Sequence, residues 1–327
     1  MSDTDVVVVG AGWAGLSAAS RLQAAGYRVV VIEKGRGAGG RSATRRQDGY
    51  QFDHGAQYFT ARSEAFGHAV SDWQTRGLVT TWAPRLTVFG ARPDSAGRAP
   101  DARWVAVPGM NAVLSDLAGR LDCRFAQRVE RMQHADRWHL TLDDGAQLEA
   151  GAVVLTAPPA QAAALLGTDH PLFSALERVP MQPTWALMAA FESLPDPGFD
   201  AAFDNEGPLS WLACNASKPA RSAASTWVAH ATVEWSRNHL EDAADRVTAA
   251  LYAALCRRLD CAHLSPAVLT AHRWRYAQCR ESLRIGCLWQ EDQRLAVAGD
   301  WAAGNRIEGA WVSGQAAARR IEEALQF

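Results

Sequence analysis

The chain has 327 residues, of which 48% are hydrophobic, and a formal net charge of −2 at pH 7. This length and apolar content predict two domains, each with a sizeable core. The near-neutral charge, without a basic stripe, argues against nucleic acid as a partner. The six cysteines form no CxxC pair and no cluster of zinc spacing, so we expect free thiols and no bound metal.

The first residues and the apolar runs bear on localisation. An apolar run begins at Val6 with no basic region or cleavage site ahead of it, which argues against a signal peptide. The apolar runs fall short of the roughly 18 residues that a membrane span requires, and Pro158 and Pro159 interrupt the longest of them. We therefore expect a soluble, cytoplasmic protein without a membrane partner.

The first predicted elements are a strand over residues 6–9 and a helix that follows it directly. Between them, Gly10, Gly12 and Gly15 form the pattern GxGxxG. Gly10 permits a tight turn, Gly12 lets the backbone approach a pyrophosphate, and Gly15 lets the helix pack closely on the sheet. The free N–H groups at the helix N-terminus then face the phosphates. The predicted dinucleotide turn comprises Gly10, Ala11, Gly12, Trp13, Ala14 and Gly15.

A second predicted strand covers residues 28–32 and is followed by Glu33 and Lys34. The Glu33 carboxylate is placed to bind the ribose hydroxyls of an adenosine. A second GxGxxG match begins at Gly35 but lacks a strand of its own, so we interpret it as the loop after the second strand. These elements predict a dinucleotide site and leave NAD and FAD both open.

The later elements interleave two groups. Pieces of the nucleotide domain recur after residue 125 and near the C-terminus, whereas an aromatic sheet and a helix lie between them. The predicted strands are 152–157, 184–191, 210–214, 226–233 and 295–298, with two more within 125–143, and the predicted helices include 240–260 and 313–325. We expect the nucleotide domain to comprise residues 1–62, 103–165 and 290–327, and the substrate domain residues 63–102 and 166–289.

Several motifs add to the glycine pattern. GAGGR at 37–41, VVLTAPP at 153–159 and AGDW at 298–301 resemble the amine-oxidase and protoporphyrinogen-oxidase type of flavoprotein. The resemblance implies an α/β fold with a glutathione-reductase-type, Rossmann-like FAD-binding domain and an inserted α+β substrate domain on a mixed or antiparallel sheet. It also implies FAD as the cofactor, bound non-covalently because no cysteine lies close behind Trp301.

The same resemblance implies roles for residues around the cofactor. Arg41, directly after Gly40, would contact phosphate or ribityl oxygens. Asp300, after Gly299, would contact the ribityl or phosphate region, and Val129 would present backbone groups to the adenine. A turn would aim backbone N–H groups and the dipole of the last helix at flavin N1 and O2. The residues of that turn are Gly309, Ala310 and Trp311.

Residues 56–58 belong to a loop that the same type of flavoprotein places beside the flavin ring. Ala56 opens this segment. The Gln57 amide would bind the pyrimidine edge or the N5 region, and Tyr58 would wall the substrate side.

A narrower resemblance covers nearly the whole chain. The motifs resemble the renalase family, above all its bacterial members. They are DHGAQYFTAR at 53–62, RWVAVPGM at 103–110, PTWALMAAF at 183–191, WLACNASKP at 211–219, TWVAHAT at 226–232, HRWRYA at 272–277 and EGAWVSGQAAA at 308–318. The resemblance implies oxidation of the 1,2- and 1,6-dihydro isomers of NAD(P)H, with O2 reduced to hydrogen peroxide.

The residue types suit this chemistry. A dihydropyridine releases hydride readily because aromatisation drives the step, so orientation near flavin N5 matters more than a strong base. A flat substrate ring would stack on an aromatic side chain. The predicted substrate-binding residues are Tyr58, Trp185, Trp211, Trp274 and Tyr276.

Two polar residues match active-site positions of the renalase family. The resemblance implies that Asn215 and His230 orient the carboxamide or the nicotinamide ring. By strand alternation, Trp211 and Asn215 share a face, and His272, Trp274 and Tyr276 share another. From its residue type alone, His230 is better explained as a core histidine.

Two further classes of function stay open. A flavin-dependent amine oxidase commonly carries a lysine near flavin N5, but Lys34 and Lys218 are the only lysines, and neither is well placed in the sequence. A non-catalytic FAD-binding or redox-sensing protein would bind FAD without rapid reduction by any donor. An NAD dehydrogenase would leave the GAGGR, LTAPP and AGDW motifs without a purpose.

Overall fold

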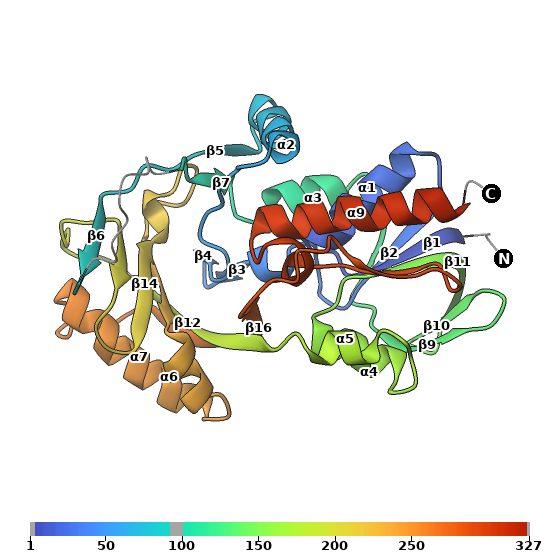
Figure 1. The fold of residues 1–327 in the computed structure, drawn as a ribbon. Helices are drawn as coiled ribbons and strands as arrows, with labels where there is room; N and C mark the ends of the chain where they lie inside the picture. The colour runs from blue at the N-terminus through green and yellow to red at the C-terminus, as the bar shows by residue number, and fades with distance from the viewer. Residues whose placement is uncertain (1–3, 92–100, 326–327) are drawn as a thin grey trace.

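A computed structural model describes residues 4–91 and 101–325 of the chain. Two sheets lie toward opposite ends of the molecule, joined by loops and small hairpins (Figure 1). Residues 92–100, within the segment 63–102 predicted for the substrate domain, lie outside the described residues, as do residues 1–3 and 326–327.

The larger sheet forms around runs of Val and Ile. Val6 and Val8 pack into one core cluster and Val7 and Val9 into another, so both faces of the sheet are buried. The strand order is β17 (Leu288–Gln290), β18 (Leu295–Val297), β11 (Gln147–Leu155), β1 (Thr4–Val9), β2 (Val29–Glu33) and β8 (Asp122–Phe125), and β10 (Trp138–Leu142) and β9 (Val129–His134) extend from β11. The pairs β18–β11, β11–β1, β1–β2 and β2–β8 are parallel.

Helices cover both faces of this sheet. α1 (Trp13–Ala24) and α9 (Ile307–Leu325) pack on one face, with α3 (Ala112–Ala118) beside them. A Cβ on Gly314 would lie 2.1 Å from the carbonyl oxygen of Ala14, so α9 approaches α1 at backbone distance. α4 (Pro159–Leu166), α5 (Phe173–Glu177) and the short α8 (Asp300–Ala303) contribute to the core on the other face.

The smaller sheet has the order β16 (Val268–Cys279), β12 (Met181–Phe191), β15 (Ser225–Ala231), β14 (Leu209–Cys214), β13 (Ala201–Asp204) and β6 (Leu86–Phe89). Its pairs are antiparallel except β13–β6, which is parallel. α6 (Val233–Asn238) and α7 (Ala244–Leu259) cover one face, and α7 buries a stripe that includes Val247, Leu251, Leu255 and Leu259.

Small elements connect the two sheets. They are the hairpin of β3 (Thr44–Gln47) and β4 (Tyr50–Asp53), the pair β5 (Val79–Thr81) and β7 (Trp104–Ala106), the 3-10 turns η1 (Gly40–Ser42) and η2 (Asn215–Ser217), and α2 (Glu64–Thr75). The ring of Trp73 in α2 lies 5.4 Å from that of Trp13 in α1, and the ring of Phe66 lies 5.5 Å from that of Trp311 in α9. α2 thus packs against α1 and α9, and α5 packs in the core cluster of the larger sheet, although both fall in segments predicted for the substrate domain.

These features confirm the predicted α/β class, a Rossmann-like domain with an inserted domain on a mixed, mostly antiparallel sheet. Several predicted boundaries shift. The last helix begins at Ile307 instead of Ser313, and the helix predicted over 240–260 begins at Ala244. The strand predicted over 226–233 ends at Ala231, because the Thr232 hydroxyl accepts the Trp235 N–H and starts α6. Among the described helices, none is long and apolar enough to cross a membrane.

Candidate active site

The turn between β1 and α1 has the backbone that a dinucleotide site requires. Gly10 has a φ of +110°, which L side chains rarely adopt. A Cβ on Gly15 would lie 1.9 Å from the Gly10 carbonyl oxygen, so this close approach needs glycine. At Gly12, the N-cap of α1, no described heavy atom beyond its two chain neighbours lies within 4 Å of the place a Cβ would take. This leaves room for a phosphate beside the helix N-terminus.

The other predicted residues near this turn are Ala11, Trp13, Ala14 and Lys34. The first three are buried, and Trp13 Nε1 donates to the Ser42 hydroxyl at 2.8 Å, which ties α1 to η1. Lys34 lies at the surface, where its Nζ donates to Gln161 Oε1 at 3.1 Å.

Glu33 ends β2, and its carboxylate joins two loops. Oε2 accepts the N–H of Ala11 at 2.8 Å, and Oε1 accepts the N–H of Gly35 at 2.7 Å. The Gly35 carbonyl accepts the N–H of Ala126 at 2.8 Å, which brings the segment leading to Val129 beside Glu33. The predicted adenosine-binding residues therefore gather at the end of β2.

Arg41 and Asp300, predicted from separate motifs, form an ion pair. The guanidinium nitrogens lie 2.6 and 3.0 Å from the carboxylate oxygens, and Arg41 also donates to the Ala277 carbonyl at 2.9 Å. A Cβ on Gly40 would lie 3.5 Å from the Cα of Gly12, so the pair stands next to the glycine turn. Because the Arg41 side chain is 35% exposed, its guanidinium can also reach a phosphate oxygen.

The start of α9 differs from the prediction. The predicted turn at Gly309, Ala310 and Trp311 is part of the helix, which begins at Ile307. The N–H of Ala310 donates to the Arg306 carbonyl at 2.9 Å and belongs to the helical ladder. The N–H groups available to a ligand at this helix end are therefore those up to Gly309. Gly299 donates its N–H to the Ser313 hydroxyl at 2.9 Å, which fixes α8 on α9.

A buried ion network lies behind the loop that follows β4. The side chains of Asp53 and Lys218 are 0% exposed and that of Arg221 is 1% exposed. One Asp53 oxygen lies 3.4 Å from Lys218 Nζ and 2.8 Å from an Arg221 nitrogen, and the other accepts the Thr44 hydroxyl and the Met110 N–H. Burial raises the pKa of Asp53, but both cations and the Met110 N–H outweigh it and lower the pKa to about 2.

Lys218 also reaches the predicted flavin loop. Its Nζ donates to Gln57 Oε1 at 3.1 Å, and the Gln57 amide nitrogen donates to the carbonyls of Asp53 and Gly55. Burial, together with the nearby Arg221, lowers the pKa of Lys218 to about 8, while Asp53 acts in the opposite direction. The expectation that neither lysine is well placed is therefore wrong for Lys218, because the fold brings its loop against residues 53–57.

One face of the smaller sheet presents a row of side chains to the same loop. Trp211 pairs with His230 between β14 and β15, and Ala186 of β12 pairs with both His230 and His272. Directly paired residues share a face of a sheet. Trp274, two residues further along β16, lies with its ring 4.4 Å from the His272 ring. Three strands, with β12 between two of them, thus build one aromatic platform, defined by Trp211, His230, His272 and Trp274.

His54 docks the loop onto this platform. Its carbonyl oxygen accepts from His230 Nε2 at 3.1 Å and from Trp274 Nε1 at 3.0 Å. Its ring stacks on Trp274 and meets His272 edge-on, both at 4.9 Å between centroids. Desolvation lowers the pKa of His54 to about 3 and that of His230 to about 4, and it also lowers the pKa of His272. The imidazoles are therefore neutral at pH 7.

A second aromatic group lies beside the platform. The Tyr58 ring is 5.7 Å from the Trp211 ring and 6.3 Å from the Trp82 ring. Lys218 Nζ stands 5.6 Å from the centre of Trp82, and the Arg103 guanidinium stands 5.4 Å from that of Tyr58. The structure thus brings Tyr58 and Trp211 together as one wall, with cations behind it.

Trp185 does not join this group. Trp185 is 3% exposed, packs in the core under α6 and α7, and donates its Nε1 to the His239 carbonyl at 3.0 Å. Since Ala186 faces the loop, its neighbour Trp185 must face the helices. Tyr276 lies beyond a register shift in the β12–β16 pairing, so alternation from Trp274 does not decide its face.

The amide of Asn215 is already engaged. The residue is 1% exposed and lies in η2, after the end of the strand in which alternation would apply. Its Oδ1 accepts the Asp53 N–H at 3.3 Å, and its Nδ2 donates to the Gln51 carbonyl at 3.0 Å. Asn215 therefore holds β4 against the smaller sheet, which differs from the predicted role of orienting a substrate.

Sequence reasoning missed several residues at the centre of the site. Asp53 and His54 stand in the DHGAQ motif, and Lys218 stands in the NASKP motif. The motifs alone do not distinguish these residues from their neighbours. Arg221 and His272 likewise had no role, although His272 was placed on the face of Trp274. The sequence did carry one signal for these residues. A charged residue in a segment that also carries buried aromatic residues often needs a buried partner of opposite charge.

The described residues fit a flavin dinucleotide. An open glycine at the start of a helix, a carboxylate at the end of the next strand and an arginine beside the turn supply the pyrophosphate and ribose contacts that such a cofactor needs. No group of three or more His, Cys, Asp or Glu among the described residues is placed to hold a metal ion. Fold and site together define a dinucleotide-dependent oxidoreductase of the two-domain flavoprotein class.

Comparison with known families makes this assignment specific. Residues 8–73 match the NAD(P)-binding Rossmann-like domain, and residues 81–322 match the family described as flavin containing amine oxidoreductase. The second match covers most of the chain, and the protein belongs to this family of FAD-dependent oxidoreductases.

Similar proteins of known identity match in part or in fold. The chain is 41% identical to human all-trans-retinol 13,14-reductase over 86 residues and 46% identical to the phytoene desaturase of Fusarium fujikuroi over 57 residues. These segments cover 26% and 17% of the chain but only 14% and 10% of those relatives.

Solved structures that are similar over the whole chain include two amine oxidases. Cyclohexylamine oxidase from Brevibacterium oxydans IH-35A has a TM-score of 0.75 at 16% identity, covering 99% of this chain and 100% of that chain. Putrescine oxidase bound to putrescine has a TM-score of 0.72 at 17% identity, covering 98% of this chain and 99% of that chain. At such identities the likeness establishes the fold alone.

Proposed function

We propose that the protein is an FAD-dependent oxidase that takes hydride from the 1,2- and 1,6-dihydro isomers of NAD(P)H and releases NAD(P)+. When bound, FAD accepts the hydride at N5 and passes the electrons to O2, which gives hydrogen peroxide. Family membership supports the cofactor and the redox class, and the resemblance to renalases supports the substrate.

The charge around the predicted flavin loop is the observation that carries the proposal. The buried network contains two cations, Lys218 and Arg221, against the single carboxylate of Asp53. Like charges about 10 Å apart repel by about 1.7 kcal/mol at an effective dielectric constant of about 20. A substrate ammonium therefore meets net repulsion, whereas a neutral dihydronicotinamide ring on an anionic dinucleotide does not.

The platform supports binding of a flat ring. His54 and Trp274 are stacked, and the neutral imidazoles of His230 and His272 lie on the same face. In the proposal, these groups exclude water and orient the nicotinamide, while His230 acts as a positioning residue through the His54 carbonyl. Hydride release needs no strong base, because aromatisation of the ring drives it.

Anaerobic reduction of the bound flavin tests the proposal. The purified holoprotein is mixed with borohydride-reduced NAD isomers, with 1,4-NADH and with a panel of primary amines, and the visible flavin band is followed. We expect rapid bleaching by the isomers and slow bleaching by the others. Rapid bleaching by an amine and none by the isomers would contradict the proposal, and a flavin that no donor bleaches would indicate a non-catalytic protein.

Two tryptophans of the same sheet provide a matched pair for the platform. Trp274→Phe removes the N–H that holds the His54 carbonyl, and we expect it to slow flavin reduction by about tenfold to a hundredfold. Trp185→Phe changes the helix-covered face and should leave that rate nearly unchanged. Equal effects of the two substitutions would contradict the proposal that the platform orients the substrate ring.

A flavin-dependent amine oxidase is the second candidate, and one contact favours it. Lys218 bonds Gln57 in the predicted flavin loop, so the lysine expected of that class has a counterpart here. The fold is also that of the cyclohexylamine and putrescine oxidases. The amine panel in the reduction experiment distinguishes the two candidates directly.

A further inference from the structure

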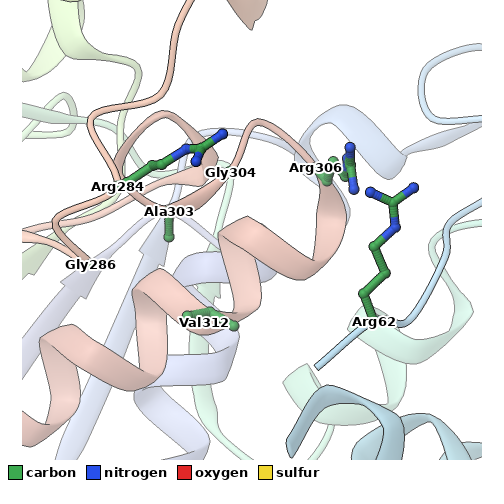
Figure 2. Close-up of a pocket in the computed structure, with 7 residues that line it drawn as sticks. All are labelled: Arg62, Arg284, Gly286, Ala303, Gly304, Arg306 and Val312. Carbon is green, nitrogen blue, oxygen red and sulfur yellow. The ribbon is translucent and has the colours of Figure 1, made fainter. Parts of the chain in front are cut away.

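A pocket beside the start of α9 is lined by three arginines. It has a volume of about 460 Å³, and Arg62, Arg284 and Arg306 stand around small residues that include Ala303 and Gly304. Figure 2 shows the Arg62 side chain directed toward Arg306, with Arg284 on the opposite side of the view. The three residues come from separate segments of the chain, so the fold gathers this charge at one place.

Two of these arginines are exposed, and their guanidinium groups form no ion pair among the described residues. Arg62 pairs with Asp101 at 2.7 Å, and the nearby Glu308 carboxylate accepts the backbone N–H groups of Arg62 and Ser63. Among the described residues, by contrast, no ion pair or hydrogen bond is formed by the guanidinium of Arg284 or of Arg306. Exposed arginines around a hollow favour an anion, because the guanidinium fork matches phosphate oxygens.

The position of the pocket limits the choice of anion. Arg306 directly precedes the 19-residue helix α9, and Arg62 follows the loop that carries Gln57 and Tyr58. The FAD pyrophosphate has its own place at the glycine turn of α1, where Gly12 leaves open space. The pocket is therefore separate from the place of the FAD pyrophosphate, and Arg62 connects it to the flavin-loop segment.

We infer that this arginine-lined pocket binds a diphosphate, which in a dihydronicotinamide dinucleotide is the pyrophosphate of the substrate. The identity of that substrate rests on the proposed function, whereas the diphosphate site itself rests on the pocket. The reactive ring would then be oriented by the platform, and the charged tail of the same molecule would be held by Arg284 and Arg306.

Calorimetry on the FAD-loaded protein tests the diphosphate site without using activity. Inorganic pyrophosphate and ADP-ribose are titrated at low and at moderate salt. We expect both to bind, more weakly as salt rises, and about tenfold more weakly for each of Arg284→Gln and Arg306→Gln. Arg246→Gln, at an exposed position on α7, is the matched control and should bind as the wild type does. Absent binding, or equal binding by the double variant R284Q/R306Q, would overturn the inference.

Kinetics then separate this inference from the proposed function. With dinucleotide isomers, the double variant should raise KM by at least tenfold and leave the limiting rate of flavin reduction unchanged. With the corresponding dihydronicotinamide riboside isomers, which lack the diphosphate, wild type and variant should have equal KM. Equal KM shifts for both donors would contradict a substrate diphosphate in this pocket. If no isomer reduces the flavin while pyrophosphate binding depends on the arginines, the proposed function fails and the diphosphate site stands.

Discussion

Lys218 shows what one buried side chain contributes to this site. It is fully buried, yet it bonds Asp53 and Gln57, and burial lowers its pKa to about 8. A lysine with such a pKa changes charge within the working range of many enzymes. Below that pH the network has net positive charge, and above it the charges of Asp53 and Arg221 balance.

Lys218→Met should therefore alter the pH dependence of flavin reduction. In the wild type we expect the rate to fall as pH rises through about 8, because the positive charge that attracts an incoming hydride is lost. In Lys218→Met the rate should be lower at pH 7 and nearly constant between pH 7 and 9. Stopped-flow reduction across this range measures the effect.

The chain offers a natural control for this prediction. Lys34, the other lysine, lies at the surface and bonds Gln161, so Lys34→Met should keep the inflection near pH 8. An inflection that persists in Lys218→Met would assign the titration to another group and remove Lys218 from the explanation.

At the scale of elements, the contact between α1 and α9 determines the geometry of the cofactor turn. A Cβ on Gly314 would lie 2.1 Å from the carbonyl oxygen of Ala14, a residue of that turn, which is too close for two non-bonded atoms. Backbone atoms of two packed helices cannot move aside as a flexible side chain can. A substitution at Gly314 should therefore disturb the glycine turn near the N-terminus.

Gly314→Ala should destabilise the protein and weaken FAD binding. The added methyl must push α9 away from α1, and overpacking of this kind costs about 1 to 3 kcal/mol. Gly67→Ala in α2 is the matched control, since no described atom beyond its chain neighbours and its own helix backbone lies within 4 Å of its Cβ position. This change should stabilise the protein by about 0.5 to 1 kcal/mol. Denaturant unfolding and FAD titration of both variants measure this. A Gly314→Ala protein as stable as Gly67→Ala would show that the two helices can separate freely.

Other elements show where sequence patterns stop being informative. The strand alternation that placed His272 and Trp274 on one face holds, because β16 is regular over those residues. It does not extend to Tyr276, where the pairing shifts register, or to Asn215, which lies in a 3-10 turn. Bulges and strand ends depend on the partner strand, and local spacing carries no information about that partner.

At the scale of the whole molecule, the cofactor site draws on segments from both ends of the chain. The glycine turn, Arg41 and Asp300 meet although Arg41 and Asp300 are separated by 259 residues. A ligand held by such segments stabilises the folded state only, by about 2.7 kcal/mol at a hundredfold excess over its Kd.

Removal of FAD, relative to a hundredfold excess over its Kd, should therefore lower the melting temperature by about 4 °C, and added FAD should restore it. Differential scanning calorimetry of the apoprotein and the reconstituted protein measures the shift. FMN, which lacks the adenosine that Glu33 is placed to bind, should restore less than FAD does. Equal melting with and without FAD would contradict a site assembled from these segments.

The nucleotide-binding half of the protein could be read directly from its residues. The glycine turn, the strand after it and Glu33 lie within one short segment, so their spacing in the sequence is enough to bring them together. The later motifs resemble those of flavoproteins and so predict FAD, and family membership supports this cofactor.

The charge and shape of the substrate side could not be read in this way. Asp53 and Lys218 are 165 residues apart, and Trp211, His230 and His272 align only through the pairing of four strands. Burial and contacts with charged groups determine the pKa values of Asp53, Lys218 and the two histidines. Both effects arise only when the chain has packed. The pocket of Arg62, Arg284 and Arg306 has the same origin, because surface arginines acquire a common ligand only when separate loops bring them together.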